Sequence, residues 1–271
     1  MLRTIPVMLA AAGMLAACDP QGDVPPAPPS TPAPAPSASA SASATPVANG
    51  ARSVSEETDD YFFEYSYPAE AGNIPELSAL LDRRLENTRT DLAEQAARAR
   101  SDARDNGFPY NRYSNNVEWK VVADLPRYLS LSANLGSYSG GAHGNYGFNS
   151  MIWDKEAGRA LDPKALFIRG NALDEALGDR LCEALNAERA KRRGDQPVGE
   201  PDDWMNQCVE IKDTTVLLGS GNGQTFDRVG ILIGPYVAGP YAEGSYELDF
   251  PVDAALLGAV KSEYREAFSA S

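Results

Sequence analysis

The chain has 271 residues, with 24 Lys and Arg against 38 Asp and Glu, so its formal net charge is −14. This acidic balance excludes the basic face that phosphate contacts require, and we predict no nucleic-acid partner. The only histidine, His143, excludes metal sites that need two or more imidazoles. We predict neither a metal ion nor a cofactor.

The N-terminus has the pattern of a bacterial export signal. Arg3 precedes an apolar run from Ile5 to Leu15, which is too short to cross about 30 Å of hydrocarbon. The end of this run, Leu15-Ala16-Ala17-Cys18, resembles a lipobox, which implies cleavage before Cys18 and its lipidation. We therefore predict a lipoprotein signal peptide over residues 1–18, with an ordinary signal peptide as the alternative.

These features predict a lipid-anchored protein on the periplasmic side of the bacterial cell envelope, at either the inner or the outer membrane. Residues 19–53 are rich in Pro, Ala and Ser and contain almost no large apolar side chains. Such a segment cannot offset its ordering entropy by burial, so we predict a disordered tether.

Residues 54–271 are predicted to form a single globular domain, with two half-modules, 54–125 and 126–271, as a further possibility. Once Cys18 is lipidated, Cys182 and Cys208 are the remaining thiols. An even pair in an oxidising compartment predicts a disulfide, since no CxxC spacing indicates redox work.

The first half of this domain begins with a strand and a long helix. Aromatic residues alternate over 61–67, which predicts a strand with one buried face. Asn73-Ile74-Pro75 opens a helix that ends at Asn106-Gly107. Its predicted buried stripe consists of Leu77, Leu81, Leu85, Leu92, Ala96 and Ala103.

Three more strands are predicted over 117–121, 129–135 and 146–153, and the last two read as a hairpin with an elaborate tip. A helix over 173–185 and strands at 216–218, 229–233 and 246–250 follow, and residues 254–268 read as a closing helix. Because no regular βαβ repeat occurs, we predict an α+β fold with a mainly antiparallel sheet, packed with the long N-terminal helix and further helices.

The hairpin tip is the main candidate binding loop. It contains, in order, Tyr138, Gly140, Gly141, His143 and Gly144. Glycine permits positive φ and close approach of the backbone to a ligand. His143 has three interpretations: a hydrogen-bonding residue of the loop, a binding residue, or a catalytic base with a nearby serine.

A second glycine- and proline-rich stretch runs from Gly234 to Gly244. Tyr236 and Tyr241, each preceded by a proline, are candidate aromatic platforms for a sugar ring or a peptide. The alternative is a rigid connection whose tyrosines pack on the sheet.

These two stretches, with 161–167, resemble the paired domains of unknown function in the extracytoplasmic module of RsiV-type anti-sigma factors, and the accessory region of the peptidoglycan deacetylase PdaC. The resemblance covers most of residues 57–268. It implies an envelope binding fold, known in one branch as a lysozyme receptor, and it transfers no catalytic residue. Because we identify no sigma-binding helix, transmembrane helix or deacetylase domain, we extend neither sigma regulation nor deacetylation to this chain.

Three functions are therefore open at this point. The first is a non-enzymatic binding domain for a macromolecule such as a basic, lysozyme-like protein, which the acidic surface would attract. The second is a peptidoglycan-acting enzyme that uses His143. The third is a sugar- or peptidoglycan-binding scaffold module that uses the tyrosine loop.

Overall fold

The computed structural model describes residues 41–46, 50–194, 200 and 202–271. The predicted signal peptide, with Cys18, and most of the predicted tether lie outside these residues. The described part of the predicted tether includes residues 41–46, which form strand β1, and Arg52, where β2 begins. The sheet thus starts before the domain boundary that we predicted at residue 54.

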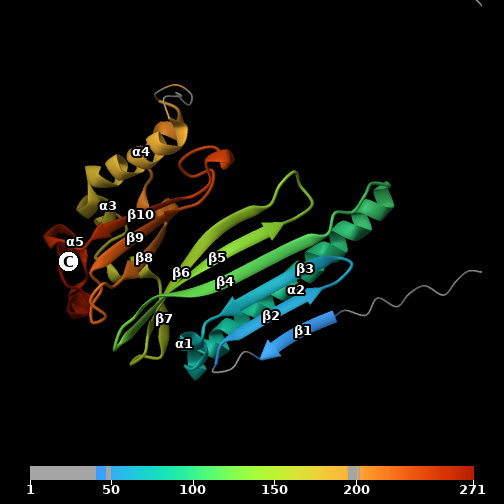
Figure 1. Cartoon of the computed structure of the whole chain (residues 1–271), viewed down its shortest axis with the longest axis horizontal. Helices are drawn as coiled ribbons and strands as arrows, with labels where there is room; N and C mark the ends of the chain where they lie inside the picture. The colour runs from blue at the N-terminus through green and yellow to red at the C-terminus, as the bar shows by residue number, and fades with distance from the viewer. Residues whose placement is uncertain (1–40, 47–49, 195–199, 201) are drawn as a thin grey trace, which may run out of the picture. The chain divides into compact units, whose positions relative to one another are not determined.

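The main sheet of the described residues has seven strands, which lie in chain order from β1 to β7 (Figure 1). Neighbouring strands in this sheet are antiparallel, except that β3 and β4 run parallel. Helix α2 connects these two strands. The strands are β1 (Ser41–Pro46), β2 (Arg52–Glu57), β3 (Tyr61–Tyr67), β4 (Tyr113–Asp124), β5 (Tyr128–Tyr138), β6 (Asn145–Asp154) and β7 (Arg159–Leu161). The predicted boundary between two half-modules, after residue 125, falls between β4 and β5. These two strands pair with each other in the same sheet.

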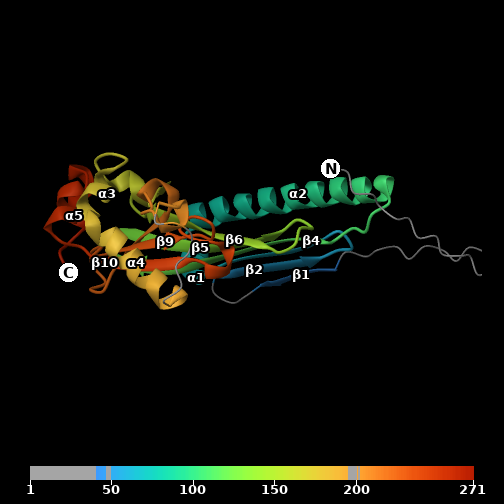
Figure 2. The ribbon, with the colours of Figure 1, turned by 90° about the horizontal axis from the view of Figure 1, so that it is seen from above.

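Helix α2 (Pro75–Asn106) lies along one face of this sheet, as Figure 2 shows. Pro75 occupies its first turn, and Gly107 ends it with a left-handed φ of 72°. The predicted stripe of α2 is buried throughout, against alternating residues of β3 such as Phe63 and Tyr65. The first core therefore forms between α2 and the sheet. A short helix, α1 (Ala69–Gly72), precedes α2.

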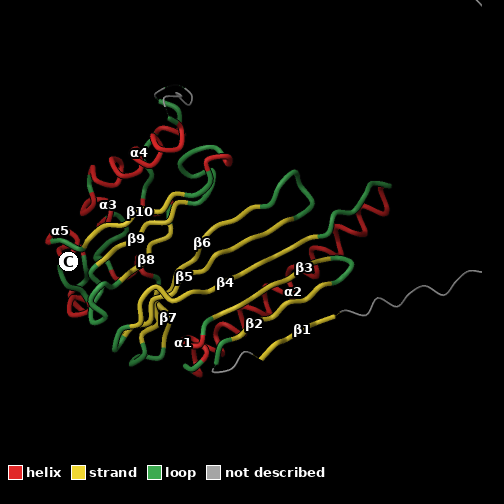
Figure 3. Tube along the Cα trace, viewed as in Figure 1, coloured by secondary structure: helices red, strands yellow, loops and turns green. Residues whose placement is uncertain are grey.

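A second, antiparallel sheet has the strand order β10-β9-β8. Its strands are β8 (Thr215–Gly219), β9 (Arg228–Ile233) and β10 (Tyr246–Pro251), and the helices beside them are α3 (Ala172–Leu177), α4 (Asp179–Arg193) and α5 (Ala254–Ala259). These elements share a second hydrophobic core with residues of β4 to β6. Figure 3 shows the resulting mixture of helices and strands, which confirms the predicted α+β class.

Two predicted helices are each interrupted. The helix expected over 173–185 breaks at Gly178, whose φ of 53° and ψ of −137° suit glycine alone. The closing helix expected over 254–268 stops at Val260, which bridges to Phe167, and a 3₁₀ helix follows over Ser262–Ala267. This second break depends on a segment distant in the sequence. Within the described residues, no helix combines the length and apolar character needed to cross a bilayer.

Candidate functional site

Two loops that lie far apart in the sequence meet through their aromatic rings. One joins β5 to β6 and carries His143, and the other joins β9 to β10 and carries Tyr236 and Tyr241. The ring of His143 stacks on that of Tyr241, with centroids 4.1 Å apart and planes 24° apart. Tyr236 lies 5.4 Å from Tyr241, and Tyr146 meets Tyr241 edge-on at 6.0 Å, centroid to centroid. We call these four rings the aromatic cluster.

The carbonyl oxygen of Gly144 joins the two loops by hydrogen bonds. It accepts from the Tyr241 hydroxyl at 2.7 Å and lies 2.8 Å from Nδ1 of His143. Since a carbonyl only accepts, Nδ1 carries a hydrogen, and Nε2 lies within hydrogen-bond distance of the Tyr236 hydroxyl, at 3.3 Å. Both ring nitrogens of His143 are thus engaged within the cluster.

Three rings of the cluster are exposed to solvent, and the fourth, that of Tyr241, is half-buried. The exposed fraction is 51% for Tyr236 and 38% for Tyr146. Tyr236 has a φ of 66°, and among the described residues it is the only non-glycine with positive φ. It sits third in a turn closed by a hydrogen bond from Val237 N to Gly234 O, a position that favours glycine or asparagine when φ is positive. The backbone of Tyr236 is therefore strained at the point where its exposed ring joins the cluster.

A nearly buried ion pair holds the loop that carries Tyr241. Arg193 of α4 donates to both carboxylate oxygens of Glu243, at 2.7 and 2.9 Å, and each side chain is 10% exposed. Tyr246 also donates to this carboxylate. Burial alone would raise the pKa of Glu243, but the hydrogen bonds from Arg193 and Tyr246 outweigh it and hold the pKa below its usual value.

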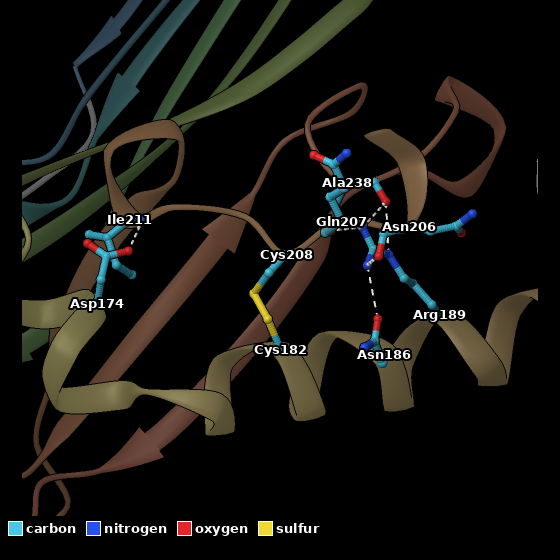
Figure 4. The surroundings of a disulfide bond; sticks show 9 residues. All are labelled: Asp174, Cys182, Asn186, Arg189, Asn206, Gln207, Cys208, Ile211 and Ala238. Carbon is cyan, nitrogen blue, oxygen red and sulfur yellow. Dashed lines mark hydrogen bonds between the residues drawn. A yellow bond between two sulfur atoms is a disulfide. The ribbon is translucent and has the colours of Figure 1, made fainter. Parts of the chain in front are cut away.

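Arg189, one turn earlier in α4, ties the same loop to a second segment (Figure 4). Its guanidinium is buried and donates to the carbonyl of Ala238 at 2.7 and 3.0 Å and to that of Gln207 at 3.0 Å. Burial, followed by the charge of Arg193, lowers the pKa of Arg189. The next residue after Gln207 is Cys208, which forms the expected disulfide with Cys182 of α4. Helix α4 therefore holds the β9–β10 loop, which carries Tyr236 and Tyr241, in place.

The other predicted site residues belong to the same β5–β6 hairpin as His143. Gly140, at the hairpin tip, adopts a φ of 83°, whereas Gly141 does not have positive φ. Tyr138 ends β5 opposite Ser114 of β4 and makes no ring contact with the cluster among the described residues.

Sequence reasoning missed Tyr146 and the arginines of α4. The available signal for Arg193 was the basic run Lys191-Arg192-Arg193, which lies beyond the helix predicted over 173–185. Within the described ranges, no group of three or more His, Cys, Asp or Glu side chains could hold a metal ion.

Comparison with known proteins supports the fold and part of the resemblance. Residues 54–146, about a third of the chain, match the family model described as Deacetylase PdaC. This span includes α2 and the tip of the β5–β6 hairpin but not the loop with Tyr241. No curated protein matches the chain.

Two similar crystal structures belong to DUF3298 family proteins. The one from Pseudomonas aeruginosa PAO1 has 21% identity and a TM-score of 0.52, over 87% of this chain and 96% of its own. The one from Bacteroides fragilis NCTC 9343 has 18% identity and a TM-score of 0.45, over 84% and 94%. The first of these shows that the fold is shared. The resemblance to RsiV-type anti-sigma factors stays a prediction from the sequence.

Proposed function

We propose that this protein is a non-enzymatic binding protein of the bacterial cell envelope, and that its aromatic cluster binds cell-wall glycan. The stack of the exposed His143 on the half-buried Tyr241, joined to the exposed Tyr236, supports this most directly. Aromatic faces offer an apolar surface for the C–H face of a sugar ring. Because α4 and the hydrogen bonds of Gly144 fix the rings in advance, little ordering entropy is lost when a ligand binds.

The hydrogen bonds of His143 favour binding over catalysis. A general base needs a free nitrogen within reach of the proton that it removes, and a partner that orients the ring. Here Nδ1 contacts the Gly144 carbonyl and Nε2 contacts the Tyr236 hydroxyl. Neither contact supplies a nucleophile of the serine or cysteine type or an orienting carboxylate.

A second candidate partner is a basic protein of the lysozyme type. The net charge of −14 favours this partner, because opposite charge accelerates association. Such binding would weaken as salt rises, whereas stacking of sugar on the rings would change little. Binding of egg-white lysozyme at low and at high salt therefore separates the two candidates.

Co-sedimentation of the full chain with purified sacculi tests the proposal. We expect the wild type to pellet, and the Tyr241→Ala and Tyr236→Ala variants to stay mostly in the supernatant. Phe108→Ala is a matched control, since Phe108 is 53% exposed and lies outside the cluster. If both tyrosine variants pellet as the wild type does, the cluster is not the binding surface.

The lipid anchor at Cys18 is part of the same proposal and is tested in cells. Cys18→Ser should move the protein from the membrane fraction to the soluble envelope fraction, because the acyl chains that would hold it are lost. A Cys18→Ser protein that stays with the membranes would exclude this anchor.

A further inference from the structure

A groove adjoins the aromatic cluster and is lined by residues of α2 and of strands β3 to β6. Its volume is about 590 Å³, which is within the range of roughly 300–1,000 Å³ that ligand sites occupy. Tyr146 lines this groove, and its ring also meets the Tyr241 ring of the cluster edge-on at 6.0 Å. The groove and the cluster therefore share a residue, and one ligand can contact both. We call it the α2 groove.

Arg84 of α2 is a cation without a partner in this groove. Its side chain is half-buried, and the guanidinium lies over the Trp119 ring, 5.6 Å from the centroid. Among the described residues the guanidinium makes neither a hydrogen bond nor an ion pair. The stack on Trp119 fixes the cation without using its five N–H donors, which stay free for a ligand.

The carboxylates nearest to Arg84 in the sequence do not neutralise it. Asp82 contacts Arg52 at 3.4 Å. Glu86 pairs with Arg89. Of the described residues that line the groove, none is Asp or Glu, and Arg84 is the only charged one. In a chain with a net charge of −14, the α2 groove is therefore a local site that attracts an anion.

Amide side chains at the rim add neutral donors to this cation. Asn87 of α2 and Asn145 and Asn149 of β6 line the groove and are exposed, so a ligand can reach them. Asn149 accepts from the backbone N–H of Ser150 through Oδ1 at 2.7 Å, which leaves its Nδ2 for a ligand. A planar guanidinium with further N–H donors around it is an arrangement that binds carboxylates.

We infer that the α2 groove binds a carboxylate of the peptide stem that is attached to cell-wall glycan. The inference rests on the proposed glycan binding by the aromatic cluster, and it extends the ligand from glycan to glycopeptide. One arginine matches the single charge of a carboxylate, whereas a phosphate monoester carries about −1.5 to −2. Because Tyr146 belongs to both surfaces, a sugar on the cluster brings its attached peptide to the groove.

Two substitutions test the cation and the rim separately. Arg84→Gln removes the charge, and Asn149→Asp adds a negative charge while it keeps the acceptor for Ser150 N. Arg83→Gln is the control for the first, because Arg83 is exposed on α2 and does not line the groove. Asn134→Asp is the control for the second, because Asn134 is exposed on β5 outside the groove. All four variants should melt close to the wild-type temperature.

Calorimetric titration of the full chain with the disaccharide-tetrapeptide that a muramidase releases from sacculi tests the inference. In this muropeptide the lactyl carboxyl group forms an amide, so every free carboxylate belongs to the stem. We expect saturable binding by the wild type and both controls, and about tenfold weaker binding by Arg84→Gln and Asn149→Asp. Conversion of the stem carboxylates to carboxamides should weaken binding by the wild type about as much, and Arg84→Gln should bind both forms equally.

No saturable binding by the wild type, unchanged binding by Arg84→Gln, or equal binding of both muropeptide forms by the wild type would overturn the inference. Tyr241→Ala separates this failure from failure of the proposed function. If Tyr241→Ala loses retention on sacculi while Arg84→Gln binds the muropeptide as the wild type does, the cluster binds glycan and the groove does not bind the stem. If Tyr241→Ala is retained as the wild type is, the proposed function fails as well.

Discussion

The ring of His143 stacks on the ring of Tyr241, and the carbonyl of Gly144, the residue after His143, accepts the Tyr241 hydroxyl. The two contacts join a hairpin of the main sheet to a loop of the second sheet. Because each loop constrains the other, the cluster forms one surface that neither loop would present alone.

The two contacts of Tyr241 should be separable by mutation. Tyr241→Phe removes the hydrogen bond to Gly144 and should lower the free energy of unfolding by about 1 kcal/mol. Tyr241→Ala also removes the stack on His143 and should cost about 1 kcal/mol more. Urea denaturation of the two variants measures this difference, and equal stability of the two would mean that the stack contributes nothing.

Tyr236 should affect binding without supporting the fold. Its positive φ costs about 1–2 kcal/mol for a non-glycine residue. Tyr236→Gly relieves that cost but adds entropy to the unfolded chain, so we expect little change in stability. Binding to sacculi should nevertheless fall, because the exposed ring is lost. A variant that loses several kcal/mol of stability would show that the ring serves the fold instead.

Much of the fold follows from local patterns in the sequence. The stripe of α2 and the alternation in β3 each specify an element and its buried face, since both depend only on helix and strand periodicity. β1 could not be predicted, because Ser41–Pro46 lies in a Ser- and Ala-rich run without large apolar side chains. The end of α5 at Ala259 could not be predicted either, since it depends on the bridge between Val260 and Phe167.

The candidate site was predictable only in parts. Both loops stand out by their Gly, Pro, Tyr and His content, but their meeting depends on the packing of the second sheet against β4 to β6.

The Glu243–Arg193 pair should make the stability of the second sheet depend on pH. The pKa of Glu243 in the folded protein lies below its usual 4.5, so the unfolded chain takes up the proton first as pH falls. The stabilisation by this carboxylate is therefore complete well above pH 4.5 and is lost as the pH falls through the folded pKa.

Glu243→Gln tests this dependence, since Gln cannot ionise. At pH 7 the free energy of unfolding of the variant should be about 3 kcal/mol lower than that of the wild type, because Arg193 is left nearly buried without its anion. This difference in the free energy of unfolding between variant and wild type should become smaller as the pH falls below 4.5. A gap that stays constant from pH 7 to pH 3 would contradict the coupling.

The Cys182–Cys208 disulfide should stabilise the domain, and it should also hold the contacts of Arg189 with the loop that carries Tyr241. It closes a loop with a sequence separation of 26, which corresponds to about 3–4 kcal/mol on the chain-entropy model. Unfolding of a Cys182→Ala/Cys208→Ala variant measures this loss. We also expect weaker binding to sacculi, because Gln207 beside Cys208 is one of the groups that hold Arg189. Full binding by a folded double variant would show that the disulfide does not position the loop.

The most direct test of the aromatic cluster as a glycan-binding surface is hydrogen-exchange mass spectrometry of the full chain, with and without soluble glycan fragments released from sacculi. We predict slower exchange over 138–146 and 234–244 when the fragments are bound, and unchanged exchange in helix α4. Bound fragments that leave exchange in both loops unaltered would contradict the account.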